Sequence, residues 1–145
     1  MSGLGVFILR AVTGVLYLLH GVPKLIGGQG SEDKVPSGAK QALGPGFEQS
    51  LQHGGIDNLS GFLGNIGVPQ PRTMAWAVSL TETLGGLALI FGFRTRLAAF
   101  ALSIVQLVAI SKVHNKEGLS GAEYNLSLLA ATTALTLPGG KKKDA

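Results

Sequence analysis

The stretch that decides the fold is MAWAVSLTETLGGLALIFGF, residues 74–93, in which Glu82 is the one charged residue among twenty. A helix of that length covers the roughly 30 Å apolar core of a lipid bilayer, which takes about 20 residues. A helix on the surface of a soluble bundle would carry a charged outer stripe, and this stretch has none. We therefore expect residues 74–93 to cross a membrane.

Three further apolar stretches accompany it, at about residues 4–24, 96–113 and 122–137. The last two are slightly short for a full span and would use their flanking residues or thin the bilayer locally. Of the 145 residues only 14% are charged, against about 25% in ordinary soluble proteins. The sequence predicts an all-α protein, with one four-helix transmembrane bundle over residues 1–138.

Basic residues predict how this bundle is oriented. Four spans place both termini on one side, together with Arg94, Arg96 and the three lysines of the tail at residues 139–145. Because lysine and arginine in short connections mark the cytoplasmic side, we expect both termini to be cytoplasmic. The excess of basic residues, a formal net charge of +4, is then explained by the orientation of the chain in the membrane. No aromatic platform on which bases could stack accompanies these residues, which argues against nucleic-acid binding.

A long outer loop, residues 27–73, joins the first two predicted spans. Its glycine- and charge-rich beginning suggests a flexible connection through about residue 40. From Phe47 to Ile66 the apolar residues have helical spacing, which Gly54 and Gly55 interrupt. We expect two short helices there, lying on the membrane or capping the bundle.

The predicted spans each have one small or polar face. On the first, a stripe along the whole helix contains Arg10, Thr13, Gly14, Tyr17, His20, Gly21 and Lys24. On the second, Ala75, Ser79 and Gly85 share a face with Glu82. Membrane helices pack through small residues and a few hydrogen-bonding side chains, so we expect these faces to point inward and the large apolar residues to face lipid.

Glu82 is the most informative single residue. A charge at the centre of a membrane helix costs about 2.5–3.5 kcal/mol on insertion scales, so Glu82 needs a partner, a proton or water. Arg10 is the expected partner, because its long side chain can span the difference in depth between the two positions. The pair is interpreted either as a structural clamp or as part of a site in which Glu82 relays protons or binds a ligand.

A second constellation is expected toward the outer leaflet. It contains His20, Lys24, His114, Glu123, Tyr124 and Asn125. These residue types fit two interpretations: a hydrogen-bonded structural cap, or a site for a quinone or another small polar head group. Lys24 also fits a lysine whose side chain extends to the membrane interface. His114 lies at or beyond the membrane edge, which disfavours haem; we expect no metal site and no intrinsic cofactor, and the lack of cysteine excludes thiolate chemistry.

The chain resembles the DoxX family of small membrane proteins over roughly residues 4–138. The matching elements are Leu9-Arg10, Gly14, residues 20–25 (HGVPKL), Gly67-Val68-Pro69, Glu82, Gly85-Gly86, Leu89, Gly92, Thr95-Arg96, His114 and Glu123-Tyr124-Asn125. The resemblance implies a four-helix bundle in a prokaryotic cytoplasmic membrane, linked to quinone-dependent redox systems. Members proposed to work in thiol chemistry would need cysteines, which this chain lacks.

These observations favour an accessory subunit of a quinone-linked respiratory or other membrane redox complex, with lipid and larger redox subunits as partners. A stand-alone quinone-binding oxidoreductase is one alternative, and a small-molecule or proton carrier that uses Glu82 is another. The sequence leaves a homo-oligomer open.

Overall fold

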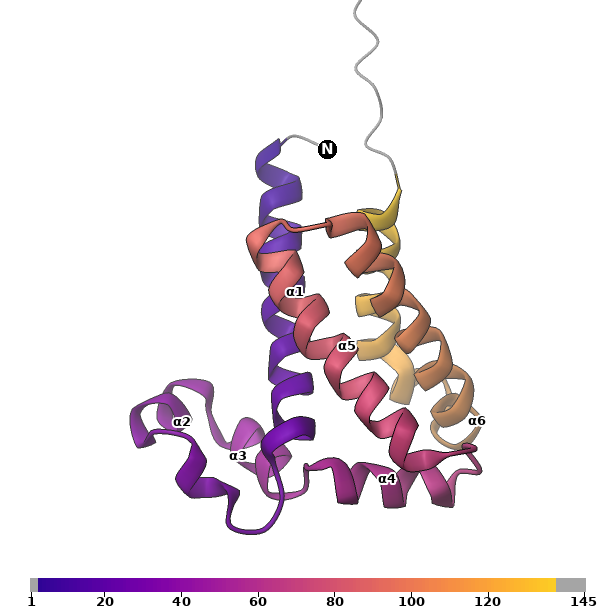
Figure 1. The fold of residues 1–145 in the computed structure, drawn as a ribbon. Coiled ribbons are helices and arrows are strands. Elements are labelled where there is room, and N and C mark those ends of the chain that lie inside the picture. The colour runs from indigo at the N-terminus through magenta and orange to yellow at the C-terminus, as the bar shows by residue number, and fades with distance from the viewer. Residues whose placement is uncertain (1–2, 138–145) are drawn as a thin grey trace, which may run out of the picture. The chain divides into compact units, whose positions relative to one another are not determined.

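The computed structural model describes residues 3–137, apart from the side chains of residues 113–117. Every element in this range is helical (Figure 1): α1 (Gly3–Ile26), the 3-10 helix η1 (Ser31–Lys34), α2 (Ser37–Leu43), α3 (Pro45–Gln52), α4 (Ile56–Asn65), α5 (Pro71–Phe91) and α6 (Thr95–Thr136). The predicted all-α class is confirmed. The contacts divide the chain into unit 1, Met1–Val15 with Gly85–Ala145, and unit 2, Leu16–Leu84.

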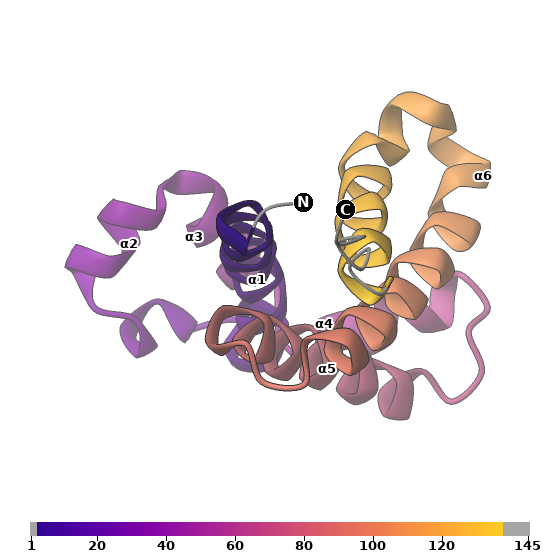
Figure 2. The same cartoon turned by 90° about the horizontal axis from the view of Figure 1, so that it is seen from above.

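Unit 2 contains the end of α1, the short helices and the start of α5. Figures 1 and 2 both place α2 and α3 on one side of the C-terminal end of α1 and α4 on the other. Turn residues separate the helices: Gly44, with a φ of 87°, precedes α3, and Gly55, with a φ of 89°, precedes α4. Pro45 then starts α3 in the first helical position, where a missing N–H costs nothing.

A glycine clasp, Gly27, Gly54 and Gly55, fixes the long connection to the end of α1. The carbonyl oxygen of Pro23 accepts hydrogen bonds from the N–H groups of Gly27, at 2.8 Å, and Gly55, at 3.0 Å. A Cβ atom on Gly27 or Gly54 would collide with that same carbonyl oxygen, and one on Gly55 with the carbonyl oxygen of Gly27. Only glycine permits so close a backbone approach.

Unit 1 contains the start of α1, the end of α5 and both limbs of α6. Gly118 has a φ of 69° and a ψ of −170° and divides α6 into these limbs. The limbs are joined by a hydrogen bond of 2.8 Å from Ser103 Oγ to Thr132 Oγ1. A Cβ on Gly14 would meet the backbone of Gly86 at 2.6 Å, so α1 and α5 are in close contact within this unit.

The distribution of side chains matches the predicted membrane setting. The buried polar residues include Thr13, Ser79, Glu82, Ser103, Gln106 and Thr132. Exposed side chains include many large apolar ones, among them Phe7, Ile8, Leu84, Phe91, Phe100 and Leu107. An exposed apolar surface of this extent suits lipid as the surrounding solvent.

Within the described part of the chain, three helices are long and apolar enough to cross a membrane: Gly3–Ile26, Pro71–Phe91 and Thr95–Lys112. They correspond to the first three predicted spans. The second limb of α6, where we predicted a span at 122–137, is not among these three helices.

One local expectation was wrong. The beginning of the outer loop, predicted as a flexible connection, forms η1 and α2. Between the third and fourth predicted spans, the chain leaves helical geometry at Gly118. Helix α3 and helix α4, separated at Gly54 and Gly55, confirm the two short helices expected between Phe47 and Ile66.

Candidate functional site

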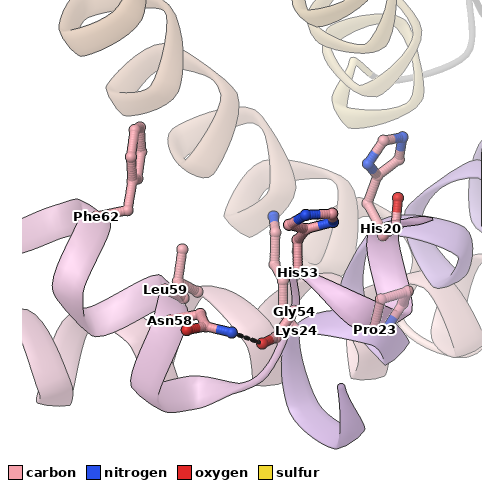
Figure 3. A pocket seen from close by; sticks show the side chains of 9 residues that line it. His20, Pro23, Lys24, His53, Gly54, Asn58, Leu59 and Phe62 are labelled. Atoms are coloured by element: carbon pink, nitrogen blue, oxygen red, sulfur yellow. Dashed lines mark hydrogen bonds between the residues drawn. The ribbon is translucent and has the colours of Figure 1, made fainter. Parts of the chain in front are cut away.

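A cavity of about 360 Å³ lies in unit 2, where the end of α1 meets the turn after α3 and the face of α4 (Figure 3). Its lining is His20, Pro23, Lys24, Ser50, His53, Gly54, Asn58, Leu59 and Phe62. His20 and Lys24 are one helical turn apart on α1 and therefore share a face. Figure 3 shows these nitrogen-bearing side chains and His53 on one side of the cavity and Phe62 on the other.

Local hydrogen bonds hold the wall formed by α3 and α4. Asn58 Nδ2 donates to the carbonyl oxygen of Gly54 at 2.8 Å, which ties α4 to the glycine clasp (Figure 3). His53 Nδ1 lies 2.9 Å from the carbonyl oxygen of Gln49. Because a carbonyl oxygen only accepts, Nδ1 must carry the proton, and a neutral His53 then has Nε2 as an acceptor.

Lys24 connects this cavity to Glu82. Its Nζ donates to Glu82 Oε2 at 2.5 Å, and the side chains of Lys24 and Glu82 are 28% and 5% exposed. Gly21 makes the approach possible, since a Cβ there would meet the Thr83 backbone nitrogen at 2.8 Å. A buried carboxylate in a membrane helix needs such a partner.

The expected partner of Glu82 was Arg10, whereas the ion pair that the structure gives Glu82 is with Lys24. Arg10 belongs to unit 1, where its guanidinium lies 5.7 Å from the centre of the Phe7 ring and beside Gly92. Its Nε is buried and has no hydrogen-bond partner among the described residues. A direct Arg10–Glu82 pair would join the two units and stays a prediction.

The other predicted site residues are not brought to this cavity. Glu123, Tyr124 and Asn125 lie on the second limb of α6 in unit 1, and the first two are exposed. The side chain of His114 lies outside the described residues. Their joining with His20 and Lys24 in one constellation stays a prediction.

Sequence reasoning missed the larger part of the cavity, which comes from the outer loop: Ser50, His53, Gly54, Asn58, Leu59 and Phe62. The available signal was His53 directly before Gly54-Gly55, at the break between two short helices. Binding residues are found disproportionately on the loops that connect regular elements.

A second cavity of about 500 Å³ lies nearby in unit 2 and shares Gly54 and Asn58 with the first. Arg72 and Asp57 line it, and Arg72 Nη1 contacts Asp57 Oδ1 at 2.6 Å. Both side chains are largely exposed, so their pairing adds little stability. The described residues include no group of three or more His, Asp or Glu side chains placed to hold a metal ion.

The chain matches the family model described as DoxX over residues 5–115. All residues of the first cavity lie in that range, whereas Glu123, Tyr124 and Asn125 lie beyond it. A Bacillus subtilis (strain 168) protein named "Putative oxidoreductase CatD" is 27% identical over 139 residues, which cover 95% of this chain and 81% of that protein. No solved structure matches the chain.

Proposed function

The chain belongs to the DoxX family, and from this premise we propose that it is an accessory subunit of a quinone-linked membrane redox complex that holds a quinone ring in the first cavity. The proposal includes four spans, a prokaryotic cytoplasmic membrane and cytoplasmic termini. One observation carries it: nitrogen-bearing side chains and an apolar wall share one cavity at the end of a helix that can span a membrane.

The residues of the cavity suit a quinone. Lys24 can donate hydrogen bonds to a ring oxygen, and Pro23, Leu59 and Phe62 offer apolar surface to the ring. The volume of about 360 Å³ accommodates a single substituted ring. A bound quinone would carry electrons and protons, which no side chain of this chain can do.

The redox class is supported by the name of the Bacillus subtilis relative, "Putative oxidoreductase CatD". The accessory role is supported by composition, because a chain without cysteine has no dithiol and no thiolate ligands for an iron–sulfur cluster. Electrons exchanged with a quinone here would pass to or from a larger subunit. The stand-alone oxidoreductase and the Glu82-dependent carrier remain the alternatives.

The first test is binding of a short-chain benzoquinone to the purified protein in mild detergent, measured by calorimetry. Removing the Phe62 ring in Phe62→Ala is expected to raise the Kd about two- to tenfold, the loss of one aromatic contact. Arg72→Leu lines only the second cavity and serves as the matched control. Absence of binding, or equal effects of the two substitutions, would contradict the proposed site.

The second test addresses the accessory role. Mild solubilisation from the native membrane followed by mass spectrometry is expected to show larger redox subunits in fixed stoichiometry with this chain. A homogeneous homo-oligomer that carries bound quinone would overturn the accessory role and favour the stand-alone alternative.

A further inference from the structure

The second cavity, of about 500 Å³, lies where two long apolar helices of unit 2 end. Its lining includes Leu25 at the end of α1, and Arg72 and Trp76 at the start of α5. Both helices are long and apolar enough to cross a membrane, so the cavity is at the level of the membrane–water interface. Tryptophan and arginine are typical anchors at that level, among the head groups of the lipids.

The cavity carries one pair of opposite charges. Arg72 Nη1 donates to Asp57 Oδ1 at 2.6 Å, and both side chains are largely exposed. Because water surrounds both groups, opening the pair costs little free energy. A guanidinium group and a carboxylate each offer several further hydrogen-bonding positions, so a ligand that brings both charges can pair with Arg72 and Asp57 at the same time.

Four glycines also line the cavity, namely the glycine clasp and Gly28. Their N–H groups donate to the carbonyl oxygens of Pro23 and Leu51 and are therefore already used. The charged groups of the lining are Arg72 and Asp57. These two side chains therefore determine which charged ligand the cavity can recognise.

An exposed apolar ridge leads from this cavity along α5. Trp76, Leu80 and Leu84 follow Arg72 at intervals of four residues and so lie on one side of the helix. They are 44%, 41% and 61% exposed. From Arg72 to Leu84 the helix rises about 18 Å, close to the depth of one leaflet in an apolar core of roughly 30 Å. An acyl chain can lie along this ridge while its head group occupies the cavity, whereas a water-soluble ligand would leave the ridge unused.

We propose that the second cavity binds the head group of a zwitterionic phospholipid that ends in a primary ammonium group, such as phosphatidylethanolamine. The phosphate pairs with Arg72, whose planar guanidinium matches phosphate oxygens, and the ammonium group pairs with Asp57. An anionic phospholipid would leave the Asp57 carboxylate without a partner. A choline head group has no N–H to donate to it. The Trp76 ring attracts either cation, so Asp57 distinguishes between them.

Trp76 is the single tryptophan of the chain, so its fluorescence reports directly on this cavity. The full-length protein is reconstituted in phosphatidylcholine vesicles that contain a fixed fraction of a phospholipid brominated on its acyl chains, because bromine quenches tryptophan at short range. We expect brominated phosphatidylethanolamine to quench as though enriched about two- to fivefold over brominated phosphatidylcholine, the value of one exposed ion pair. Equal quenching by the two lipids in the wild-type protein would overturn the inference.

Variants of the charge pair test which groups recognise the lipid. Asp57→Asn leaves Arg72 without its partner, and we expect its preference to move to the anionic phosphatidylglycerol. Asp57→Asn combined with Arg72→Gln removes both charges and is expected to give equal quenching by phosphatidylethanolamine and phosphatidylcholine. The matched control, Glu32→Gln with Lys40→Gln, removes the same two charges from η1 and α2, outside the cavity lining, and should behave as the wild type. A preference for phosphatidylethanolamine that survives the loss of both Asp57 and Arg72 would contradict the site.

A further measurement separates the lipid from its soluble head group. Glycerophosphoethanolamine carries the same phosphate and ammonium groups without acyl chains. Added in excess to the wild-type vesicles, it is expected to leave the quenching by brominated phosphatidylethanolamine unchanged, because it cannot use the apolar ridge. Relief of the quenching would indicate a soluble ligand and overturn the assignment to a lipid. The inference does not depend on the proposed function, which places its quinone in the first cavity.

Discussion

At the residue scale, Gly21 sets how closely α1 approaches α5 within unit 2. We expect Gly21→Ala to lower the free energy of unfolding by about 1–3 kcal/mol, the usual cost of overpacking, because the new Cβ would meet Thr83 Oγ1 at 2.6 Å. Thermal unfolding in detergent measures this loss. Gly61→Ala is the control, because a Cβ at that helical position meets nothing within 4 Å. Equal unfolding temperatures for the two variants would rule out close packing at Gly21.

The hydroxyl of Thr132 gives a second prediction at this scale. Thr132→Val keeps the shape of the side chain but removes the acceptor of the Ser103 hydrogen bond between the limbs of α6. The expected loss is about 0.6 kcal/mol, the average for hydrogen bonds between membrane helices, because the single Ser103 hydroxyl proton can then be donated to the Ala99 carbonyl oxygen. Unfolding of Thr133→Val, at an exposed position, is the reference. A larger loss in the reference variant would contradict the assignment.

Two of the nine residues that line the cavity, His20 and Lys24, could be predicted from the sequence, and so could Glu82, which pairs with Lys24. His20, Lys24 and Glu82 were recognisable because placing a polar residue in an apolar span costs free energy, so such a residue indicates a structural or functional role. The contact between Lys24 and Glu82 was not predicted, because depth along the helix axis was the only available criterion and it does not show how closely two helices approach. The 2.5 Å contact to Lys24 depends on Gly21, whose effect is visible only in three dimensions.

At the scale of the element, Gly118 interrupts α6. Its φ of 69° and ψ of −170° lie in a region that is open almost only to glycine. We therefore expect Gly118→Ala to destabilise the protein by about 1–3 kcal/mol, the cost of a residue held in such a conformation. Thermal unfolding against Gly38→Ala, a substitution in α2 with no atom near the new Cβ, measures the effect. Unchanged stability would show that the chain can continue as a straight helix through residue 118.

The elements differ in how far they could be predicted. Three long apolar helices follow from composition and length, because a bilayer allows few other structures for such stretches. The helices η1 and α2 were missed because their residues are small and polar and show no apolar periodicity. The glycine clasp was equally invisible, since sequence alone does not show which backbone groups will meet at Pro23.

At the scale of the whole molecule, the absence of cysteine makes the topology directly testable. We expect a single cysteine in Ser37→Cys to react with a membrane-impermeant maleimide added to intact cells, because Ser37 is exposed in the predicted outer loop. Ser2→Cys and Lys142→Cys should react only after the membrane is opened, as basic flanks stay in the cytoplasm.

The same labelling distinguishes four spans from three. With four spans, Ser2→Cys and Lys142→Cys are protected together. Length and apolarity alone support three spans among the described residues. With three spans, one of these two cysteines would react in intact cells, and the proposed orientation of the termini would have to be abandoned.

The clasp at Pro23 also has a consequence for how such a protein can change over evolutionary time. The segment from Gly28 to Gly54 begins and ends close to the carbonyl group of Pro23, so it resembles an insertion at a single point of the chain. Within this segment η1 and α2 both contact α3, and Ser31 Oγ donates to the Leu51 carbonyl oxygen at 3.2 Å, so the segment should change as one unit. New partners could therefore be acquired by exchanging the whole segment, whereas randomised libraries at positions 27, 54 and 55 should return glycine.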